Sequence, residues 1–383
     1  AHYYQRASSA DYLGVDPTRR SLTGTGGYVK VGRKGNAKWN FSETFTWSSP
    51  GFDLNDMGYM KETDYLMNET EIMYRQTDIW KIFRYNAFTL SQKNMWNYGG
   101  TPFSNNASLR WQSMTMNRYE WDVKETFAWN WLDSRLLRGG PDVRFGSYFL
   151  TSAKFNTDKA KRMMFMLKYE GDHNFEGNRF NTISPSLTFR LGNHVYLSGQ
   201  LDYAWNTDEM QYVATTSPLS SSSLTPYYYV MGHMDQKTYG LTLKLQVNVT
   251  PDISIQFYGA PFTSIAKYDD FKLAADTKSH TFENRFQRID PDHLTYADGV
   301  YTIGEGAGQM PFRNPDFRFN EFRSNLVARW EYLPGSTLYF VWEHRMSNRD
   351  NWYSSGWGSN LDRMWGLPAT NTFMIKMNYW FNL

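Results

Sequence analysis

The fold is decided by residues 322–344, which read FRSNLVARWEYLPGSTLYFVWEH. In residues 326–332 the larger apolar side chains recur at every second position. The turn residues Pro334 and Gly335 follow, and the same alternation resumes in residues 338–342. A period of two residues, with charged residues on the second face, predicts two antiparallel strands joined by a tight turn.

The C-terminal residues 370–381 repeat this pattern, with Phe373, Ile375 and Met377 on one face and Lys376 on the other. Strands of soluble proteins are usually about 5–6 residues long. A membrane-spanning strand needs about 9–11 residues. Long strands with one apolar and one polar face are typical of a transmembrane β-barrel, so we predict an all-β protein of this class.

The composition agrees with this interpretation. The 383 residues contain no apolar run of the roughly 20 residues that a membrane helix needs. Aromatic residues make up 18% of the chain, and barrels use them as girdles at both membrane interfaces. The net charge of +2 argues neither for nucleic acid nor for another polyanion, so no nucleic acid is expected as a partner. The absence of cysteine excludes disulfides, thiolate metal sites and a cysteine nucleophile.

Alternating segments recur along the whole chain and predict sixteen strands in an antiparallel up-and-down barrel. We place these strands at residues 2–8, 21–31, 39–47, 65–77, 84–96, 106–116, 120–131, 145–156, 162–173, 179–191, 194–206, 237–250, 253–262, 320–332, 337–345 and 370–381.

The predicted connections alternate between short and long. Bacterial barrels have short periplasmic turns and longer extracellular loops, so both chain ends are expected on the periplasmic side. The segment 207–236 is expected as one of the long loops and contains a serine-rich tract at residues 216–225. The longest connection, residues 263–316, is expected to fold over the barrel mouth or to contact a partner.

Five segments resemble an outer-membrane family of the Bacteroidota, the one known as domain of unknown function 5916. They read HYYQRASSADYLGVDPTRRSLTG, WSSPGFDLNDMGYM, DSRLLRGGPDVR, MDQKTYGLTLKLQVNVTPDISIQFYGAPF and DFRFNEFRSNLVARWEYLPGSTLYFVW. They are spread over nearly the whole chain and keep the order that the family has.

The resemblance implies a location in the bacterial outer membrane and no settled activity. It further implies that residues 1–383 form one barrel domain, the C-terminal part of a longer protein. Members of the family usually carry upstream strands and a domain similar to family-9 carbohydrate-binding modules. Upstream strands would raise the number in the barrel above sixteen.

The residues on the polar face of the predicted strands are the candidates for the barrel lumen. They mix both signs of charge, which predicts a wet or salt-bridged lumen without strong ion selectivity. The candidates are Glu120, Asp122, Lys124, Arg190, Asp202, Lys244, Arg329, Glu331, Glu343, Arg345 and Lys376.

Two loop features are candidates for contacts. Residues 132–144 combine three arginines and two aspartates with Gly139, Gly140 and Pro141. They form either an inward-folded loop that narrows the lumen or a purely structural turn. A second set of loop aromatics either stacks on sugars or a partner, or forms the upper aromatic girdle. These aromatics are Trp352, Tyr353, Trp357 and Trp365.

No catalytic, cofactor-binding or metal site is predicted. The seven histidines lack zinc-site spacing, and no serine lies in a nucleophile elbow. Acidic clusters, such as the one at Asp53, Asp56 and Asp64, lack a calcium-loop spacing and are interpreted as solvated loops.

These observations predict a non-enzymatic outer-membrane barrel that serves as a scaffold or as a subunit of an outer-membrane assembly. The alternative is a passive porin or glycan-uptake channel. The expected partners are outer-membrane lipid, lipopolysaccharide and other proteins of such an assembly. Glycans are partners under the alternative. A blocked lumen with large contacts outside the membrane favours the scaffold, and an open lumen favours the porin.

Overall fold

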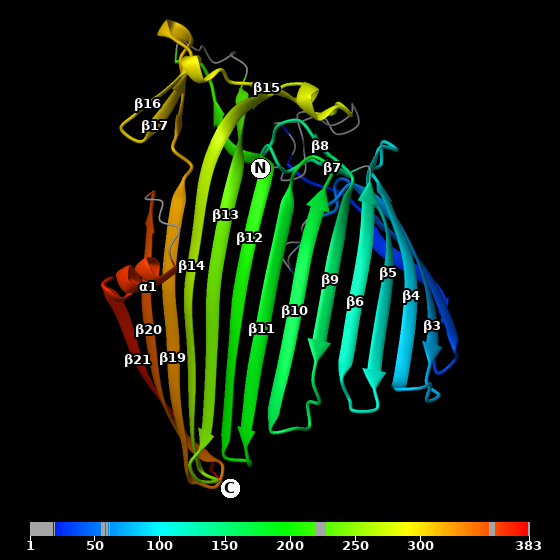
Figure 1. Ribbon diagram of the computed structural model, residues 1–383, viewed down its shortest axis with the longest axis vertical. Helices are drawn as coiled ribbons and strands as arrows, with labels where there is room; N and C mark the ends of the chain where they lie inside the picture. The colour runs from blue at the N-terminus through cyan, green and yellow to red at the C-terminus, as the bar shows by residue number, and fades with distance from the viewer. Residues whose placement is uncertain are drawn as a thin grey trace.

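The structure, a computed structural model, describes residues 18, 20–54, 58, 60, 62–129, 131–219, 227–351 and 357–381. One curved antiparallel sheet of sixteen strands makes up most of it (Figure 1). All but one of these strands follow each other in chain order, each paired with the next. They are β1 (Gly26–Arg33), β2 (Trp39–Ser48), β3 (Tyr65–Gln76), β4 (Phe83–Trp96), β5 (Pro102–Thr115), β6 (Glu120–Trp129), β9 (Tyr148–Asn156), β10 (Met163–Asn174), β11 (Arg179–Leu191), β12 (Val195–Thr216), β13 (Tyr228–Asn248), β14 (Ile253–Ala274), β19 (Phe317–Leu333), β20 (Ser336–Asp350) and β21 (Ala369–Asn378).

The predicted strands match this sheet closely. Each of the fifteen predicted strands after the first coincides with one strand of the consecutive path, and the pairing is antiparallel throughout. The first predicted strand, residues 2–8, lies outside the described residues. The prediction of an all-β, up-and-down antiparallel architecture is therefore confirmed.

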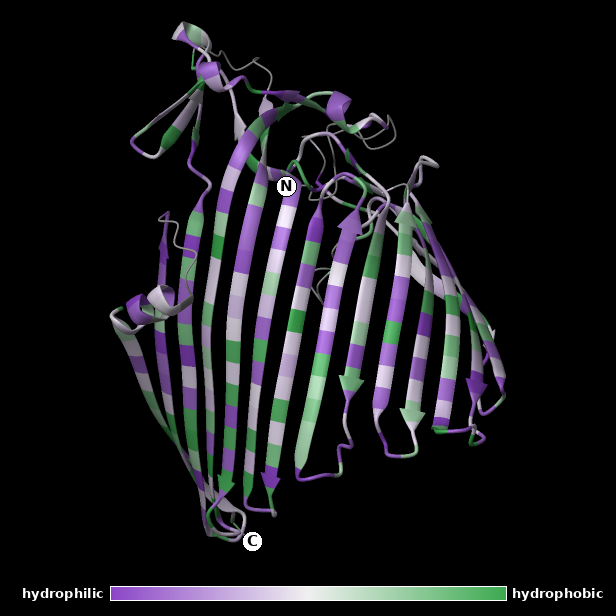
Figure 2. Ribbon diagram, in the orientation of Figure 1, coloured by the Kyte–Doolittle hydropathy of each residue, from purple (hydrophilic) through white to green (hydrophobic). Residues whose placement is uncertain are grey.

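The register divides the side chains of the sheet into two faces. Leu245, Phe257, Leu326, Trp342 and Phe373 lie opposite one another on consecutive strands and form one row of an apolar face. The row one residue away contains Lys244, Tyr258, Asn325, Glu343 and Thr372, and it belongs to a polar face. The hydropathy colours alternate along the strands in the same way (Figure 2).

The two ends of the sheet differ. Tight turns join the strands at one end, which we call the turn end and which lies at the bottom of Figure 1. The β19–β20 turn is an example, because Gly335 adopts a φ of 79° that other residues rarely take. The longest connections and all three small sheet or hairpin additions lie at the opposite, loop end (Figure 1).

Three strands extend far beyond their predicted lengths at the loop end. β12, β13 and β14 have 22, 21 and 22 residues. Much of the segment 207–236, which the sequence predicts as a long loop, is therefore strand, and that prediction is wrong. The alternation fails there because apolar residues such as Met210, Met231 and Val230 are all fully buried. β-bulges near Asp208 and Tyr212 break the period further.

Most of the smaller elements lie at the loop end. β7 (Trp131–Asp133) and β8 (Val143–Phe145) form a hairpin between β6 and β9. β16 (Leu294–Ala297), β17 (Val300–Ile303) and β18 (Met310–Arg313) form a small sheet, and β15 (Phe286–Arg288) pairs with β14. Short 3-10 helices lie at Phe282–Arg285, Pro291–His293 and Gly306–Gly308. The helix α1 (Trp357–Trp365) precedes β21. No helix among the described residues has the length and apolarity needed to cross a membrane.

The sheet does not close on itself within the described residues. β1 and β21 are its two edges and do not pair with each other. They lie at opposite sides of the molecule in Figure 1. The closed barrel of the sequence prediction is therefore not formed by these fifteen consecutive strands. Because every pairing is antiparallel and the path has an odd number of strands, β1 and β21 run parallel to each other.

Candidate functional site

All eleven charged residues predicted to face a lumen lie on the polar face of the sheet. Most of them contact their strand neighbours. Asp122 accepts two hydrogen bonds from Arg110, at 2.7 and 2.5 Å. The carboxylate of Glu120 lies 2.5 Å from Lys159 Nζ. Asp202 accepts hydrogen bonds from Ser184 at 2.6 Å and from Gln200 at 2.9 Å. Charged side chains on the polar face thus pair with other polar side chains of the same face or of the turns beside it.

The polar face of β19 and β20 is rich in arginine. Arg323 and Arg345 lie directly opposite each other across the two strands. One oxygen of Glu321 lies between them, at 2.8 Å from Arg323 and 3.0 Å from Arg345. This shared carboxylate offsets the repulsion of two like charges in a cross-strand pair. Sequence reasoning selected Arg345 and missed Glu321 and Arg323, which follow the same alternation two residues apart.

The remaining seven candidates lie on β6, β11, β13, β19, β20 and β21. Arg329 is 2.5 Å from Glu331, whose other oxygen accepts a hydrogen bond from the Gly335 amide. Lys376 lies over the ring of Tyr339, with its nitrogen 5.9 Å from the ring centroid. Arg190 donates to the carbonyl oxygen of Lys159. Three further residues, Lys124, Lys244 and Glu343, lie on the polar face of β6, β13 and β20.

The insertion between β6 and β9 leaves the sheet and lies beside the polar face at the loop end. Its hairpin β7–β8 borders a cavity that Lys93 and Asn106 line from β4 and β5. Lys93 and Asn106 lie opposite each other on the polar face. Asp133 shapes the tip, because its carboxylate accepts hydrogen bonds from the Arg135 and Leu136 amides. Of the two alternatives for residues 132–144, the geometry favours the inward fold.

The same insertion reaches the extensions of the long strands. Leu137 and Val143 from the insertion form a buried core with Met210 of β12, Met231 of β13 and Phe286 of β15. The insertion therefore contacts β4 and β5 on one side and β12 to β15 on the other. Between these two sides the sheet runs through β6, β9, β10 and β11. Residues 131–145 thus form, with residues 275–289, a layer across the loop end, which we call the mouth layer.

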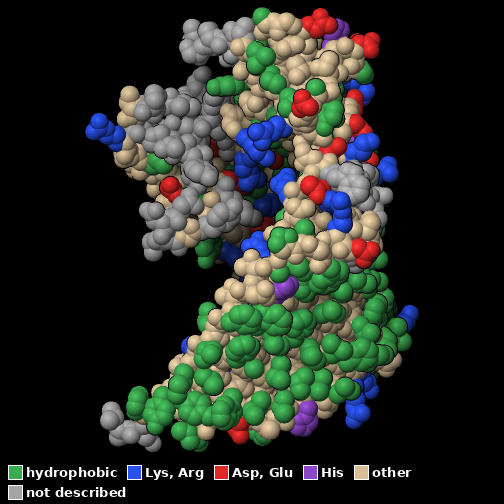
Figure 3. Space-filling view, turned by 90° about the vertical axis from the view of Figure 1, so that its left-hand side faces the viewer, with side chains coloured by type: hydrophobic (Ala, Val, Ile, Leu, Met, Phe, Trp, Pro, Cys, Tyr) green, Lys and Arg blue, Asp and Glu red, His purple; other side chains and the backbone are tan. Residues whose placement is uncertain are grey.

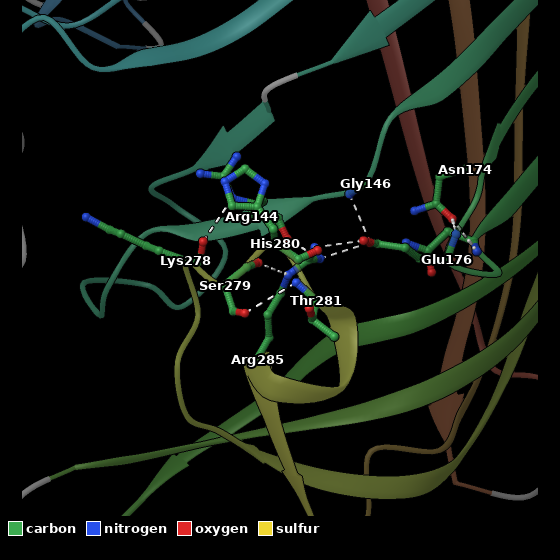
Figure 4. A network of polar contacts seen from close by, with 10 residues as sticks. Arg144, Gly146, Asn174, Glu176, Lys278, Ser279, His280, Thr281 and Arg285 are labelled. Carbon is green, nitrogen blue, oxygen red and sulfur yellow. Dashed lines mark hydrogen bonds and ion pairs between the residues drawn. The ribbon is translucent and has the colours of Figure 1, made fainter.

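A buried ion pair holds the mouth layer together (Figure 4). Arg285, only 1% exposed, donates two hydrogen bonds to Glu176 in the β10–β11 turn, at 2.8 and 3.0 Å. It also donates to the carbonyl oxygens of Arg144, Ser279 and His280. Glu176 in turn accepts a hydrogen bond from the Gly146 amide. One guanidinium thus joins three segments that lie far apart in the sequence.

A histidine links the extensions of two long strands beside this layer. His233 of β13 lies 3.1 Å from Glu209 of β12 and 3.6 Å from Asp235. Burial lowers the pKa of His233, but its hydrogen bond to Glu209 and the charges of Glu209, Asp235 and Asp269 outweigh burial and raise the pKa above the ordinary 6.5. The protonated form therefore strengthens the contact between β12 and β13.

The small sheet at the loop end packs on the same extensions. Ile303 and Phe312 from this sheet form a buried core with Phe271 and Leu273 of β14 and Val230 of β13. The connection 263–316 is therefore ordered structure at the loop end, and its residues 263–274 continue β14. The expectation that this connection folds over a barrel mouth or contacts a partner stays a prediction, because the described strands do not close a barrel.

The predicted loop aromatics are only partly described. Trp352 and Tyr353 lie outside the described residues. Trp357 begins α1, and Trp365 ends it. The ring of Trp365 packs edge-on against Phe322 of the apolar face, with centroids 4.9 Å apart. Trp365 therefore lies beside the apolar face and away from the mouth layer.

Among the carboxylates on the apolar face, Glu43 and Glu125 stand between large apolar residues and were missed in the sequence. Glu43 lies between Phe41 and Phe45 on that face of β2 and accepts hydrogen bonds from Asn68 and, at 2.6 Å, from Thr70. Glu125 of β6 accepts a hydrogen bond from Thr151 at 2.7 Å. Both interrupt an otherwise apolar alternation, which is the signal that could have revealed them.

Among the described residues, no group of three or more His, Cys, Asp or Glu side chains is arranged to hold a metal ion.

Comparison with known proteins identifies the family of the chain. A family model described as Domain of unknown function (DUF5916) matches residues 3–383. A search of the curated proteins finds no match.

The first prediction concerns the buried ion pair. Replacing Arg285 by glutamine leaves Glu176 buried and uncompensated, and such a loss typically costs about 3–5 kcal/mol. We expect the segment 275–289 to exchange its amide hydrogens much faster and to become sensitive to protease, while the main sheet stays protected. The matched control is Arg288→Gln, since Arg288 is 74% exposed and contributes little. Equal exchange in both variants would contradict a clamping role for Arg285.

The second prediction concerns pH. A raised pKa means that the contribution of His233 is fully present below the unfolded value near 6.5 and is lost as pH rises through the folded value. Hydrogen exchange in the β12 and β13 extensions should therefore quicken as the pH rises above the ordinary histidine pKa of 6.5, after correction for intrinsic rates. The variant His233→Gln should lose this pH dependence. A pH dependence that survives in the variant would assign it to another group.

Proposed function

Because the chain belongs to the family described as Domain of unknown function (DUF5916), a description that assigns no activity, we propose its function from the geometry. We propose that the sheet is the wall of a β-barrel in the bacterial outer membrane. In this proposal the protein is a non-enzymatic structural subunit of an outer-membrane assembly, and it does not work as an open channel. The observation that carries the proposal is the mouth layer, which crosses the polar face at the loop end.

The apolar face supports a membrane setting. Large apolar side chains remain exposed on it, for example Leu197, Leu201, Leu243 and Phe373. A broad band of hydrophobic side chains covers the lower part of the molecule in Figure 3. Soluble proteins rarely expose apolar surface on this scale. In the proposed setting this face contacts lipid and lipopolysaccharide acyl chains, and the turn end is periplasmic.

The apolar-face carboxylates support a role as a subunit. A carboxylate that faces acyl chains is costly, and ionisable groups at such places usually mark functional contacts. Glu43 and Glu125 lie on β2 and β6, five or six residues from the turn end, whereas at that depth the same face of β12 to β14 carries Leu201, Leu243 and Phe257. We therefore assign the β2–β6 side to a protein partner with hydrogen-bond donors and the β12–β14 side to lipid.

A passive porin is the second candidate. The observation that favours it is the paired, mixed-sign charge on the polar face, which suits an aqueous lumen. The mouth layer weighs against it, because its buried core and the Arg285–Glu176 pair occupy the entrance that solutes would use. Lumen conduction separates the two candidates.

The third prediction tests the membrane setting by single-cysteine labelling, which the cysteine-free chain permits without background. Bimane attached at Leu243→Cys should be quenched by spin-labelled lipid, and bimane at the neighbouring Lys244→Cys by aqueous iodide. The reason is that neighbouring residues of a strand face opposite sides. A label at Lys278→Cys in the mouth layer is the aqueous control. Equal iodide quenching at Leu243 and Lys244 would argue against a lipid-facing strand.

The fourth prediction tests the channel. The intact protein in planar bilayers should show no stable conductance steps, with its insertion verified by heat-modifiable gel mobility. A variant in which residues 134–142 are replaced by Gly-Gly keeps the paired ends of β7 and β8 and removes most of the insertion. That variant should conduct if the mouth layer blocks the lumen. Large conductance steps from the intact protein would contradict the scaffold proposal and support the porin.

A further inference from the structure

A cavity of about 410 Å³ lies at the turn end of the sheet. Its walls are the β5–β6 turn, the β9–β10 connection and the first residues of β10, which include Met163 and Phe165. Figure 1 shows the two connections next to each other at the bottom of the sheet. The volume lies within the range of ligand pockets, which begins at about 300 Å³.

The cavity borders the apolar face. Met163 lies in one row with Phe189, Leu197 and Leu245, and this row belongs to the apolar face. Met163 is 58% exposed. Phe165, two residues further along β10, points to the same side of the sheet. The apolar part of the lining is therefore continuous with the surface that contacts acyl chains in the proposed membrane setting.

An aromatic cluster lies on the apolar side of the cavity. The ring of Tyr119, which lines the cavity, packs edge-on against Phe155, with centroids 5.8 Å apart. The ring of Phe155 also lies 4.4 Å from that of Trp121 and 6.5 Å from that of Phe165. In membrane proteins, tyrosine and tryptophan concentrate at the boundary between acyl chains and head groups. In the proposed setting the cavity therefore lies at the depth of lipid head groups.

Two cations at the cavity have no acidic partner. Arg118 and Lys161 line the cavity and are exposed, and neither forms an ion pair with another described residue. The acidic residue of the lining is Asp158, which is 8% exposed. Its carboxylate accepts a hydrogen bond from the Ala160 amide at 2.9 Å. The lining thus has one positive charge in excess, which fits an anionic ligand.

The backbone of Arg118 indicates a specific use of its side chain. Its φ of 60° lies in the left-handed region, which residues other than glycine, asparagine and aspartate rarely adopt. The Arg118 amide donates a hydrogen bond to the Thr115 carbonyl oxygen at 2.9 Å, which holds the turn. Glycine would relieve the strain at this position. Strained residues cluster at binding sites, so an arginine at this position supports a role in binding.

The turn end as a whole is positively charged. The seven connections between strands at this end contain seven lysines and arginines but three aspartates. The complete chain, by comparison, has a net charge of only +2. Basic residues beside a membrane surface attract anionic lipids. A zwitterionic head group has no net charge for this field to attract, so the turn end fits a head group with a net negative charge.

We propose that this cavity binds one anionic phospholipid of the periplasmic leaflet. The phosphate lies at Arg118 and Lys161, and the acyl chains run along Met163, Phe165 and the ring of Tyr119. A free phosphate ion would leave the apolar walls without contacts, so the lining favours a lipid. The site deepens the proposed function and rests on its membrane setting. It lies at the border of the β2–β6 side, which that proposal assigns to a protein partner.

The test is lipid selectivity at the cavity of the full-length chain in bilayers of phosphatidylcholine. Bimane attached at Asn117→Cys, in the turn that lines the cavity, reports lipid bound there. The probes are trace amounts of phosphatidylglycerol and phosphatidylcholine, spin-labelled at the same acyl position. Phosphatidylglycerol should associate about tenfold more strongly or better, because each basic residue at the surface favours an anionic lipid about fivefold. Equal quenching by the two lipids would overturn the proposal.

Variants of the labelled chain locate the site. Arg118→Gln and Lys161→Gln should each lower the preference for phosphatidylglycerol about fivefold. The matched control is Lys34→Gln, which removes an exposed cation from the β1–β2 turn and should keep the preference. An equal loss in the control would assign the selectivity to the general charge of the turn end and not to the cavity. An unchanged preference in both cavity variants would likewise rule out the cavity.

A second label separates this site from the membrane setting. Bimane at Leu243→Cys should be quenched equally by both labelled lipids, since that residue meets the bulk bilayer. Quenching at Leu243 without selectivity at Asn117 would remove the lipid site and leave the membrane setting intact. Absence of lipid quenching at Leu243 would contradict the membrane setting and the lipid site with it.

Inorganic phosphate separates a lipid from a free anion. Added in excess, it should leave the selectivity at Asn117→Cys unchanged relative to sodium chloride of the same ionic strength. A loss of selectivity in phosphate alone would identify the free ion as the ligand and overturn the assignment to a lipid.

Discussion

The structure depends on one constraint, the pairing of every backbone amide and carbonyl along a continuous antiparallel ladder. Fourteen consecutive pairings satisfy it from β1 to β21. In the proposed membrane setting the constraint is absolute, because acyl chains offer no hydrogen bonds to a free sheet edge. The edges at β1 and β21 then need strands from outside the described residues. Since these two edges run parallel, antiparallel closure requires an odd number of added strands.

The same ladder explains how much of the fold could be predicted from the sequence. Wherever one face is apolar and the other polar, the period of two residues revealed each strand. It located β13 from Leu241 to Val247 and β20 from Leu338 to Trp342. At the loop end both faces of the strands are packed, so Met210 and Met231 are buried and the alternation disappears. The bulges of β12 remove the remaining period.

The candidate site was predictable in part, for a related reason. Residues on the polar face follow the local alternation, so Asp122 and Arg345 could be selected by counting along a strand. Arg285 and Glu176 are separated by 109 positions, and nothing local marks either as the partner of the other. The insertion was selected in the sequence for its three arginines and two aspartates. The structure holds it by an Asp133 turn, an apolar core and an arginine from a distant segment.

A buried ion pair is weak support for stability in itself, since the desolvation of two charges can exceed their attraction. Its value at the loop end is geometric. The Arg285 guanidinium offers five donors in a fixed plane, and four different acceptor residues satisfy them. An apolar contact could slide, whereas this set of bonds fixes the mouth layer in one position. A fixed layer is of little use to a pore that must admit solutes. It suits a protein whose loop end presents a constant surface, which favours the subunit over the channel.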